Sequence, residues 1–366
     1  MKDLWGKRRL AVSIIAAAVL LLCTCLTAYA TVKIKSKKEE GAVVQRAEEA
    51  LQKFTDRFYK LEEDGQRGQI VGGAFWTEAE MFEIVVDAYE KTGDEKYHTL
   101  MDQLYHGFID NYGDDWAYNT FNDDIMWMTI GCARAYELTG EQEYLDRAVT
   151  NFNLVYDRAW TDDLGGGLLW KTDRTCKNAC INGPATIAAC LLNRITGEEV
   201  YLEKALKIYQ WEVDTLYQEN GAVYDNIEAD GTFNTWCSTY NQGTFIGASQ
   251  LLHELTGDEK YLDNAIAAAD YTMNDMYQKG VINNEDEGGD LPGFKGILAR
   301  WLGKLVIEEG QEQYKDWMKL NADTAWSNQN SKGMIWTLWG EKSEETFYMP
   351  WGCSAAIAQF FAVIGM

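Results

Sequence analysis

A phrase that recurs roughly every 50 residues constrains the fold of this chain more than any other feature. In each full copy an apolar helical run ends in Thr-Gly, and acidic residues follow at once. Glycine closes a helix in the left-handed conformation, and acidic residues stabilise the positive end of the next helix, so each copy marks the turn of a helical hairpin. The copies read AYEKTGDEKYHTLM, AYELTGEQEYLDRA, LNRITGEEVYLEKA and LHELTGDEKYLDNA, beginning at residues 88, 135, 192 and 252, with a degenerate copy at 306–318.

Helical periodicity extends over twelve segments, which predicts an all-α fold. Five hairpins are flanked by an unpaired first helix and an unpaired last one, and pairing these two would close an (α/α)6 barrel of six helical hairpins. The alternative is an open superhelix, which would need a polar face on its last helix, yet 353–365 is apolar nearly all round. Strand-like alternation is confined to short pieces such as 333–339. The predicted helices are 40–63, 75–91, 94–110, 121–138, 141–157, 178–195, 198–217, 239–255, 258–277, 293–308, 311–327 and 351–364.

The first thirty residues differ from the rest of the chain. Lys2, Lys7, Arg8 and Arg9 precede an apolar run over 10–30 that ends in Ala-Tyr-Ala. This pattern predicts a secretory signal peptide or an uncleaved amino-terminal membrane anchor, and it leaves the choice open. We therefore expect an exported protein, extracellular or held at the cell surface. The predicted domains are 1–30 for the signal or anchor, 31–39 for a linker and 40–366 for the barrel.

Charge and cysteine content narrow the class of partner and site. The formal charge of −24 argues against nucleic acid and anionic lipid, so we expect no nucleic-acid partner and membrane contact only through the possible anchor. The chain has three histidines, which makes a histidine-based metal site or a Ser-His-Asp triad improbable. We expect no metal and no cofactor, and a monomer. The spacing of Cys176 and Cys180 is unlike that of the usual zinc-binding pairs. Whether these two cysteines form a disulfide is left open.

The loops between hairpins indicate where function lies. The Thr-Gly turns are tight, whereas the connections that lead back to the inner helices are long and rich in Gly, Asp, Asn and Trp. Elaborate loops therefore lie on one rim, and we expect the functional site there. The inner helices also begin on that rim, with amides, hydroxyls and aromatic rings at their starts. Such a funnel suits a neutral polyol, and the 14 Trp and 20 Tyr residues point weakly the same way.

Two adjacent aspartates, Asp123 and Asp124, begin the otherwise apolar segment NTFNDDIMWMTIG at 119–131. Adjacent helical residues point about 100° apart, so both carboxyls can approach one bound group. Two close carboxyls resist double ionisation, which leaves one ionised nucleophile and one proton donor, as a retaining glycosidase requires. The alternative is a helix-capping aspartate with an accidental neighbour. For Lys295 and Arg300, on an inner helix, pairing with internal acids and substrate contact are equally open.

Four stretches together resemble glycoside hydrolase family 76, the endo-α-1,6-mannanases of bacteria and their fungal cell-wall relatives. They are the Asp-Asp pair, KNACINGPATIAA at 177–189, TYNQGTFIGA at 239–248 and FKGILAR at 294–300, each at the start of an inner helix. The resemblance runs from about residue 40 to the end. It implies an (α/α)6 barrel that cleaves α-1,6-mannan with retention, Asp123 as nucleophile and Asp124 as acid/base. The substrate-binding residues that it implies are Asn122, Trp170, Asn182, Tyr240, Asn241, Gln242, Asp290, Phe294, Lys295 and Trp351.

The resulting expectation is a retaining endo-α-1,6-mannosidase acting on α-mannan or manno-oligosaccharides. Three rivals stay open. One is a cell-wall mannan transglycosylase, whose acceptor is a sugar in place of water. The others are a non-catalytic mannan-binding protein on the same ring, and a sugar hydrolase with an inverting mechanism and more widely spaced carboxyls.

Overall fold

The computed structural model describes Trp5, residues 38–283, Glu285, residues 287–346 and residues 348–366. By its internal contacts the chain divides into a unit Met1–Arg46 and a unit Ala47–Met366, and the architecture below is that of the second unit. The run predicted to be a signal or anchor, 10–30, lies outside the described residues. Among the described residues, no helix has the length and apolar character that crossing a membrane requires.

The described part of the chain is mostly helical, with eleven helices after a first helical segment at 38–58. Every predicted helical segment is present. The boundaries are α2 Phe75–Thr92, α3 Glu95–Tyr112, α4 Asn122–Thr139, α5 Gln142–Ala159, α6 Ala179–Thr196, α7 Glu199–Thr215, α8 Thr239–Thr256, α9 Glu259–Asp275, α10 Phe294–Glu308, α11 Lys315–Ser327 and α12 Pro350–Ala362.

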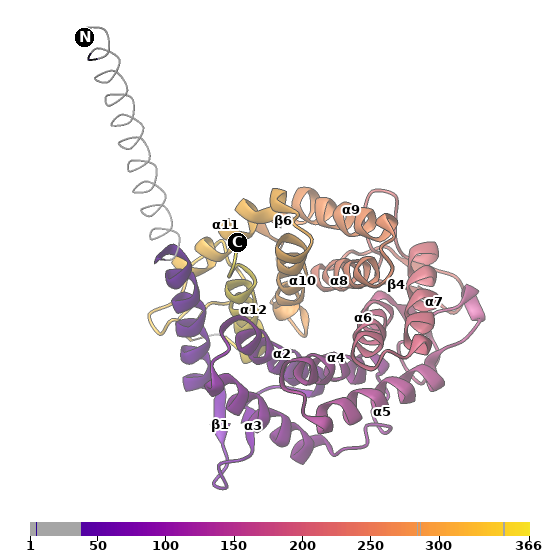
Figure 1. Ribbon diagram of the computed structural model, residues 1–366, viewed down its shortest axis with the longest axis horizontal. Helices are drawn as coiled ribbons and strands as arrows, with labels where there is room; N and C mark the ends of the chain where they lie inside the picture. The colour runs from indigo at the N-terminus through magenta and orange to yellow at the C-terminus, as the bar shows by residue number, and fades with distance from the viewer. Residues whose placement is uncertain (1–4, 6–37, 284, 286, 347) are drawn as a thin grey trace. The chain divides into compact units, whose positions relative to one another are not determined.

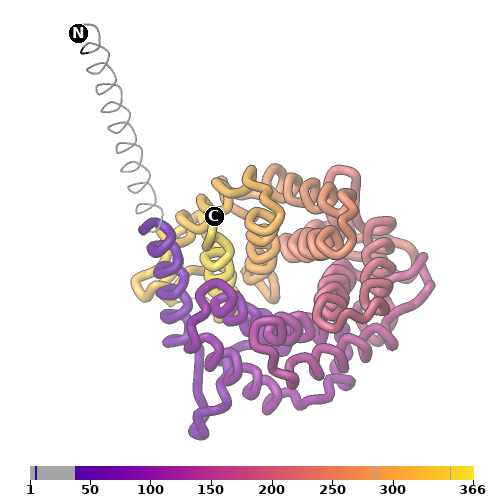
Figure 2. Tube along the Cα trace, viewed as in Figure 1, coloured from indigo at the N-terminus to yellow at the C-terminus, as the bar shows by residue number. Residues whose placement is uncertain are grey.

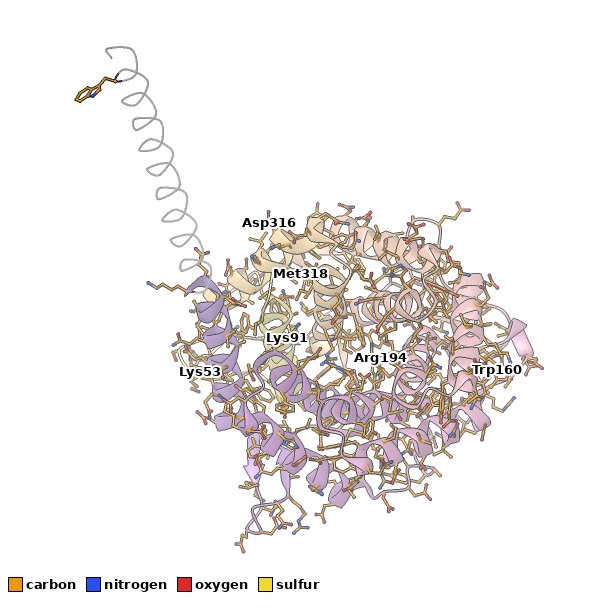
Figure 3. All side chains as sticks on the ribbon, viewed as in Figure 1. Lys53, Lys91, Trp160, Arg194, Asp316 and Met318 are labelled. Carbon is orange, nitrogen blue, oxygen red and sulfur yellow. The ribbon has the colours of Figure 1, made fainter. Side chains whose placement is uncertain are left out.

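The six even-numbered helices form a closed inner ring. Each contacts the next in chain order, and α12 contacts α2, so the last helix returns beside the first of the ring. Figure 1 shows the odd-numbered helices outside this ring, and Figure 2 shows the chain proceeding around it once. In Figure 3, Asp316 and Trp160 lie at the outer edge, whereas Arg194 lies toward the centre. These contacts confirm a mostly helical fold and show that the inner helices close a ring through α12 and α2, whereas the predicted pairing of the first helix with the last stays a prediction.

Local chemistry explains the hairpin turns. Gly93, Gly140, Gly197 and Gly257 follow α2, α4, α6 and α8 with φ of 63°, 73°, 72° and 66°, the left-handed conformation expected of the repeat. Glutamate lies in the first turn of each outer helix that follows. The repeated phrase therefore accounts for the tight turns that join each of these inner helices to the outer helix after it.

Close packing between inner helices depends on small residues. At Gly243 of α8, an added Cβ would lie 2.6 Å from the Cα of Leu298 on α10, so a larger side chain would push these helices apart. The last helix, α12, is buried over its whole length, as its uniformly apolar sequence predicts.

The predicted extent of the first helix, 40–63, is wrong. The first helical segment ends at residue 58, and Tyr59–Leu61 (β1) pairs antiparallel with Gly68–Ile70 (β2), because Asp64 accepts hydrogen bonds from the backbone of Gln66 and Arg67 and closes a turn. The 333–339 segment forms no strand. The other short strands are β3 Cys176–Asn178, β4 Asn226–Glu228, β5 Phe233–Asn234, β6 Tyr277–Gln278 and β7 Val281–Ile282, all in connections between helices.

A buried ion network joins three inner helices. Arg300 of α10 contacts Glu80, Glu83 and Asp87 of α2 at 2.8–3.0 Å, and Arg134 of α4 contacts Glu83 and Asp87 at 2.7 Å. Arg300 thus pairs with internal acids, one of the two roles left open for it. Lys295 is also internal: its ammonium donates to the carbonyl of Thr337 at 2.7 Å.

Candidate active site

The Asp-Asp pair lies in the first turn of α4, on the rim of the long connections. Neither aspartate is the N-cap residue, which is Phe121, so the helix-capping interpretation is wrong. Asn122 fixes this turn: its amide donates to the carbonyl of Leu169 at 2.8 Å, and its oxygen accepts from Arg158 at 2.6 Å. The turn is therefore tied to the connection that carries Trp170.

The Asp123 carboxyl is held in an environment that favours its neutral form. Burial and the nearby charge of Asp124 raise its pKa to about 8. The thiol of Cys180 approaches Oδ2 at 3.5 Å, and Oδ1 is buried without a hydrogen-bond partner. The neighbouring indole N–H of Trp170 partly offsets the rise in pKa, although it makes no hydrogen bond of ordinary geometry. Asp123 is thus a titratable group with one oxygen free for a ligand.

Asp124 lies beside it in a more polar setting. Burial raises its pKa to about 6, and the charge of Asp290 adds to the rise, while a hydrogen bond from the Asn119 amide at 3.0 Å opposes it. The two carboxyls titrate as one coupled pair. At pH values between these two pKa values, the pair carries one proton and one negative charge.

The order of these pKa values does not follow the expected roles. The pKa values place the proton more firmly on Asp123, whereas a nucleophile has to be ionised. A sugar in the cavity would change the burial of both groups. The assignment of Asp123 as nucleophile therefore rests on the family resemblance.

The pair faces a cavity of about 750 Å³ with an aromatic wall. Tyr240 of α8 stacks on Phe294 of α10, with ring centroids 3.8 Å apart and planes inclined by 21°. Trp76 of α2 packs against Phe294, and Trp127 of α4 packs against Tyr240. First turns of five inner helices therefore converge on one opening, which suits a ligand with apolar faces and hydroxyl groups.

The structure divides the twelve predicted site residues into two groups. One group lines the cavity: Asp123, Asp124, Trp170, Tyr240, Asp290 and Phe294. The other is outside the lining: Asn122, Asn182, Asn241, Gln242, Lys295 and Trp351.

Residues of the second group stabilise the walls of the cavity. Gln242 accepts from the backbone N–H of Val223 and donates to the carbonyls of Gly221 and Ala268. The Asn182 amide bonds to both backbone groups of Leu168. These two amides are fully buried and have their partners within the chain.

The remaining members act close to the lining. Trp351 donates to the carbonyl of Asp290 at 2.7 Å and packs edge-on against Trp76. Asn241 donates to the Asp225 carboxylate at 3.1 Å. Both residues thus hold side chains or backbone that do line the cavity.

Several lining residues were not predicted as site residues. Trp76 stands at the start of an inner helix, and that position was the available signal. Cys180 likewise lies in the first turn of an inner helix, α6, whereas most of the others come from the short strands and the residues beside them, where no pattern in the sequence distinguishes them. Besides Trp76, the unpredicted lining residues include Cys176, Asn178, Cys180, Asp225, Asn226, Glu228 and Trp236. All six cysteines in the described part are free, which answers the open question about Cys176 and Cys180.

In the described part of the chain, one group has spacing suited to a metal ion, namely His98, Asp102 and Glu141. It lies at the rim of the Thr-Gly turns, away from the cavity. Its members bond to one another, with His98 Nε2 2.8 Å from Glu141. These three side chains are on or next to α3 and α5, whereas the Asp-Asp pair begins α4.

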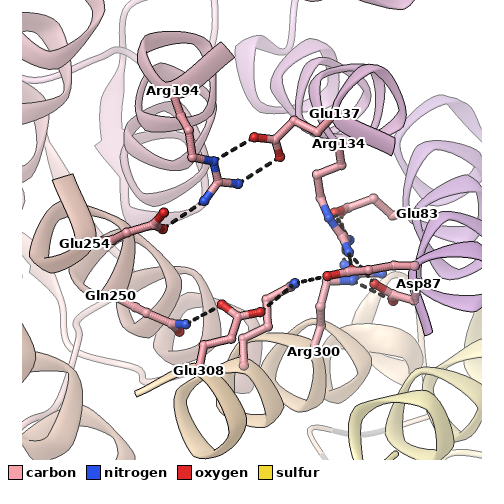
Figure 4. Close-up of polar contacts among 11 residues, drawn as sticks. Glu83, Asp87, Arg134, Glu137, Arg194, Gln250, Glu254, Arg300 and Glu308 are labelled. Carbon is pink, nitrogen blue, oxygen red and sulfur yellow. Dashed lines mark hydrogen bonds and ion pairs between the residues drawn. The ribbon is translucent and has the colours of Figure 1, made fainter. Parts of the chain in front are cut away.

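A second cavity, of about 390 Å³, lies among the last turns of the inner helices. Its polar groups are largely paired with one another: Arg194 contacts Glu137 and Glu254, and Gln250 donates to Glu308 (Figure 4). Carboxylates held in ion pairs are poor proton donors. The chemistry therefore belongs to the cavity of the Asp-Asp pair.

Comparison with known proteins identifies one family of glycoside hydrolases by both sequence and structure. A family model described as glycosyl hydrolase family 76 matches residues 42–360. The α-1,6-mannanase of Salegentibacter sp. HEL1_6 has a similar structure, with a TM-score of 0.81 and 34% identity, covering 88% of this chain and 99% of that one. That protein was solved as an inactive variant with two neighbouring aspartates changed to asparagine, in complex with α-1,6-mannotriose.

Two more distant relatives extend the comparison. A protein of Listeria innocua has a TM-score of 0.80 at 27% identity, covering 88% of this chain and 96% of its own. The mannan endo-1,6-α-mannosidase DCW1 of Saccharomyces cerevisiae is 26% identical over 298 residues. This match covers 74% of the present chain but 64% of the yeast protein, so the chain spans less than two thirds of that relative.

Proposed function

The chain belongs to glycosyl hydrolase family 76, and from this premise we propose that it is a retaining endo-α-1,6-mannosidase that hydrolyses the backbone of α-mannan. The observation that carries the proposal is the adjacent pair of carboxyls, Asp123 and Asp124, lining a cavity with an aromatic wall. The Salegentibacter enzyme, in which two neighbouring aspartates were replaced in an inactive complex with α-1,6-mannotriose, supports the substrate and the importance of such a pair.

The proposed reaction is a double displacement. Asp123 attacks the anomeric carbon while Asp124 gives its proton to the glycosidic oxygen, and the bond between that carbon and oxygen breaks. Asp124, now ionised, takes a proton from water, which attacks the same carbon and releases Asp123. Two inversions leave the product with the α configuration of the substrate. Asp124 thus gives one proton to the leaving oxygen and regains one from the attacking water, so the pair ends in its starting protonation state.

The aromatic wall and the polar lining have separate parts in this proposal. Tyr240, Phe294 and Trp76 offer apolar faces to the C–H faces of mannose rings. Burial raises the pKa of Asp290, and this residue lies close enough for its charge to raise the pKa of Asp124. Asn122, Asn182 and Gln242 are proposed to hold the walls, in place of the direct substrate contacts that the resemblance implied.

The experiment that tests the function is proton NMR of an α-1,6-manno-oligosaccharide digest, following the first anomer released. We expect the α anomer, with the β anomer growing later by mutarotation. Early β product would indicate inversion. Chains longer than the substrate would indicate transglycosylation, and binding without cleavage would leave a mannan-binding protein. The control is the Asp123→Asn variant, in which the signal should disappear.

The pH dependence of kcat/KM should be bell-shaped. Below the pKa of about 6 both carboxyls carry protons, so no nucleophile is present; above the pKa of about 8 both are ionised, so no proton donor remains. Activity thus requires the singly protonated pair, and the maximum should lie between the two values. Initial rates at low substrate concentration measure this profile. A rate that stays constant across both pKa values would contradict a shared-proton mechanism.

Export is also proposed, with residues 1–30 as signal peptide or anchor, residues 31–39 as linker and the catalytic domain outside the cytoplasm. The basic residues before an apolar run that ends in Ala-Tyr-Ala support this proposal. Fractionation of producing cells would test it, since an anchored protein stays with membranes and a cleaved one enters the medium. We propose a monomer, which the mass in solution would check.

A further inference from the structure

One wall of the cavity is a small sheet whose side chains alternate between two faces. β3 and β4 pair antiparallel, with Cys176 opposite Glu228 and Asn178 opposite Asn226. These four side chains all line the cavity. The intervening Lys177 points away, since its ammonium donates to the carbonyl of Thr161 at 3.0 Å. The two-residue period of the strands therefore presents a row of polar groups to the cavity.

The polar groups of this row are held firmly and one is unsatisfied. Asn178 is 7% exposed and Asn226 is 5% exposed. The Asn226 amide donates to Glu228 at 2.8 Å, which fixes both side chains. Oδ1 of Asn178 is buried with no hydrogen-bond partner. A buried acceptor without a partner is costly, so this oxygen fits a ligand that donates a hydrogen bond.

An aromatic side chain completes the wall. Trp236 follows β5 and lines the cavity while remaining 41% exposed. Its backbone N–H donates to the side chain of Asn234, which pairs with Asn226 in the sheet, so the tryptophan is tied to the polar row. A partly exposed indole beside fixed amide and carboxylate groups matches a pyranose, which has apolar faces and hydroxyls at its edge.

The wall lies next to the reacting pair. Cys180, two residues after Asn178, contacts Asp123 at 3.5 Å. The nearby charged groups, Glu228 and Asp225, are acidic, so an anionic sugar would be repelled, whereas a neutral one can donate hydroxyl hydrogens to them. The position and the chemistry both favour a mannosyl unit of the same chain, beyond the one that reacts.

We propose that Asn178, Asn226, Glu228 and Trp236, here called the sheet wall, form a subsite for a neutral mannosyl unit next to the cleaved linkage. This inference rests on the proposed function, because it takes the substrate to be a chain of mannose units. The subsite contributes binding energy to long substrates and sets which linkage of an oligosaccharide is cut.

The test compares substrates of increasing length. kcat/KM is measured on a series of α-1,6-manno-oligosaccharides with the wild type and the Asn178→Ala and Trp236→Ala variants. We expect each variant to lose roughly tenfold in kcat/KM on chains that reach the wall, mainly through KM, as for one lost contact. The shortest cleaved substrate should be much less affected, and the cleavage positions on longer chains should shift.

Phe233→Ala is the matched control, because Phe233 is an exposed aromatic on β5 outside the cavity lining. It should behave as the wild type on every substrate. Equal losses on all lengths in the two wall variants would indicate a structural role and overturn the subsite, as would no loss at all.

Failure of the subsite and failure of the function give different results. If the wild type cleaves mannan and Trp236→Ala cleaves it equally well, the subsite is wrong and the function stands. If the wild type cleaves nothing but binds mannotetraose by calorimetry, and that affinity falls in Trp236→Ala, the subsite stands and the hydrolase is wrong. An affinity that is unchanged in Trp236→Ala, or absent in the wild type, overturns the subsite.

Discussion

Asp123→Asn and Asp124→Asn should each lower kcat on α-1,6-mannan by at least roughly 10²–10⁴-fold, with the fold intact. Asparagine keeps the shape of the side chain but can neither form the ester intermediate nor hold the transferable proton. Reducing-end release measures the rate, and circular dichroism with thermal unfolding checks the fold. Asp146→Asn, an exposed aspartate on α5, is the control and should keep full activity. Substantial activity in either site variant would exclude the assigned pair.

A second comparison separates the two roles. With an aryl α-mannoside whose leaving group needs no proton, Asp124→Ala should still form the glycosyl-enzyme, whereas Asp123→Ala should not. A burst of released phenol followed by slow turnover measures this. The comparison is informative because the order of the two pKa values places the proton on Asp123. A burst in Asp123→Ala in place of Asp124→Ala would reverse the roles.

Arg300→Met should lower the free energy of unfolding by about 3–5 kcal/mol, because it removes the cation paired with buried Glu80 and one of the two cations paired with Glu83 and Asp87. The Arg300 side chain is 2% exposed, and Glu80, Glu83 and Asp87 surround it. Such a loss is a large fraction of the stability of an ordinary domain. Urea unfolding with an unchanged m value measures it.

Two further variants test the cause of this effect. Lys60→Met removes an exposed ion pair with Glu62 and should cost at most about 1 kcal/mol. Adding Glu80→Gln to Arg300→Met should recover part of the lost stability. Glu80 accepts a hydrogen bond from the Arg300 guanidinium through one oxygen, and its other oxygen has no partner, so a neutral amide is less costly there once the arginine is gone. An Arg300→Met protein as stable as the wild type would show that the network contributes little.

Much of the fold could be read from the sequence because its signals are local. The Thr-Gly phrase fixes a helix end and the next helix start within a few residues, and the helical period identifies the buried face of each helix. The position of the Asp-Asp pair at an inner-helix start followed from the same count. The first helix was predicted to extend to residue 63 but ends at residue 58, because the turn closed by Asp64 overrides the helical pattern there.

The site was predicted less completely because side chains of one motif serve two purposes, lining the cavity or holding its walls. Tyr240 and Gln242 are two positions apart in one motif, yet the ring lines the cavity and the amide bonds to the backbone of a neighbouring connection. Lys295 likewise donates to Thr337, 42 residues away. Nothing within the motif distinguishes a wall-forming amide from a ligand-binding one.

The sequence by itself determined the helices, their order along the chain and the rim on which the carboxyl pair lies, since each depends on chemistry within one or two turns of helix. Only the tertiary structure decided which polar side chains face the cavity, that Arg300 lies among buried carboxylates, and that two short strands add a wall with an unsatisfied amide at Asn178. The physical reason is that a buried polar group is defined by its partner. Here those partners come from segments far apart in the chain.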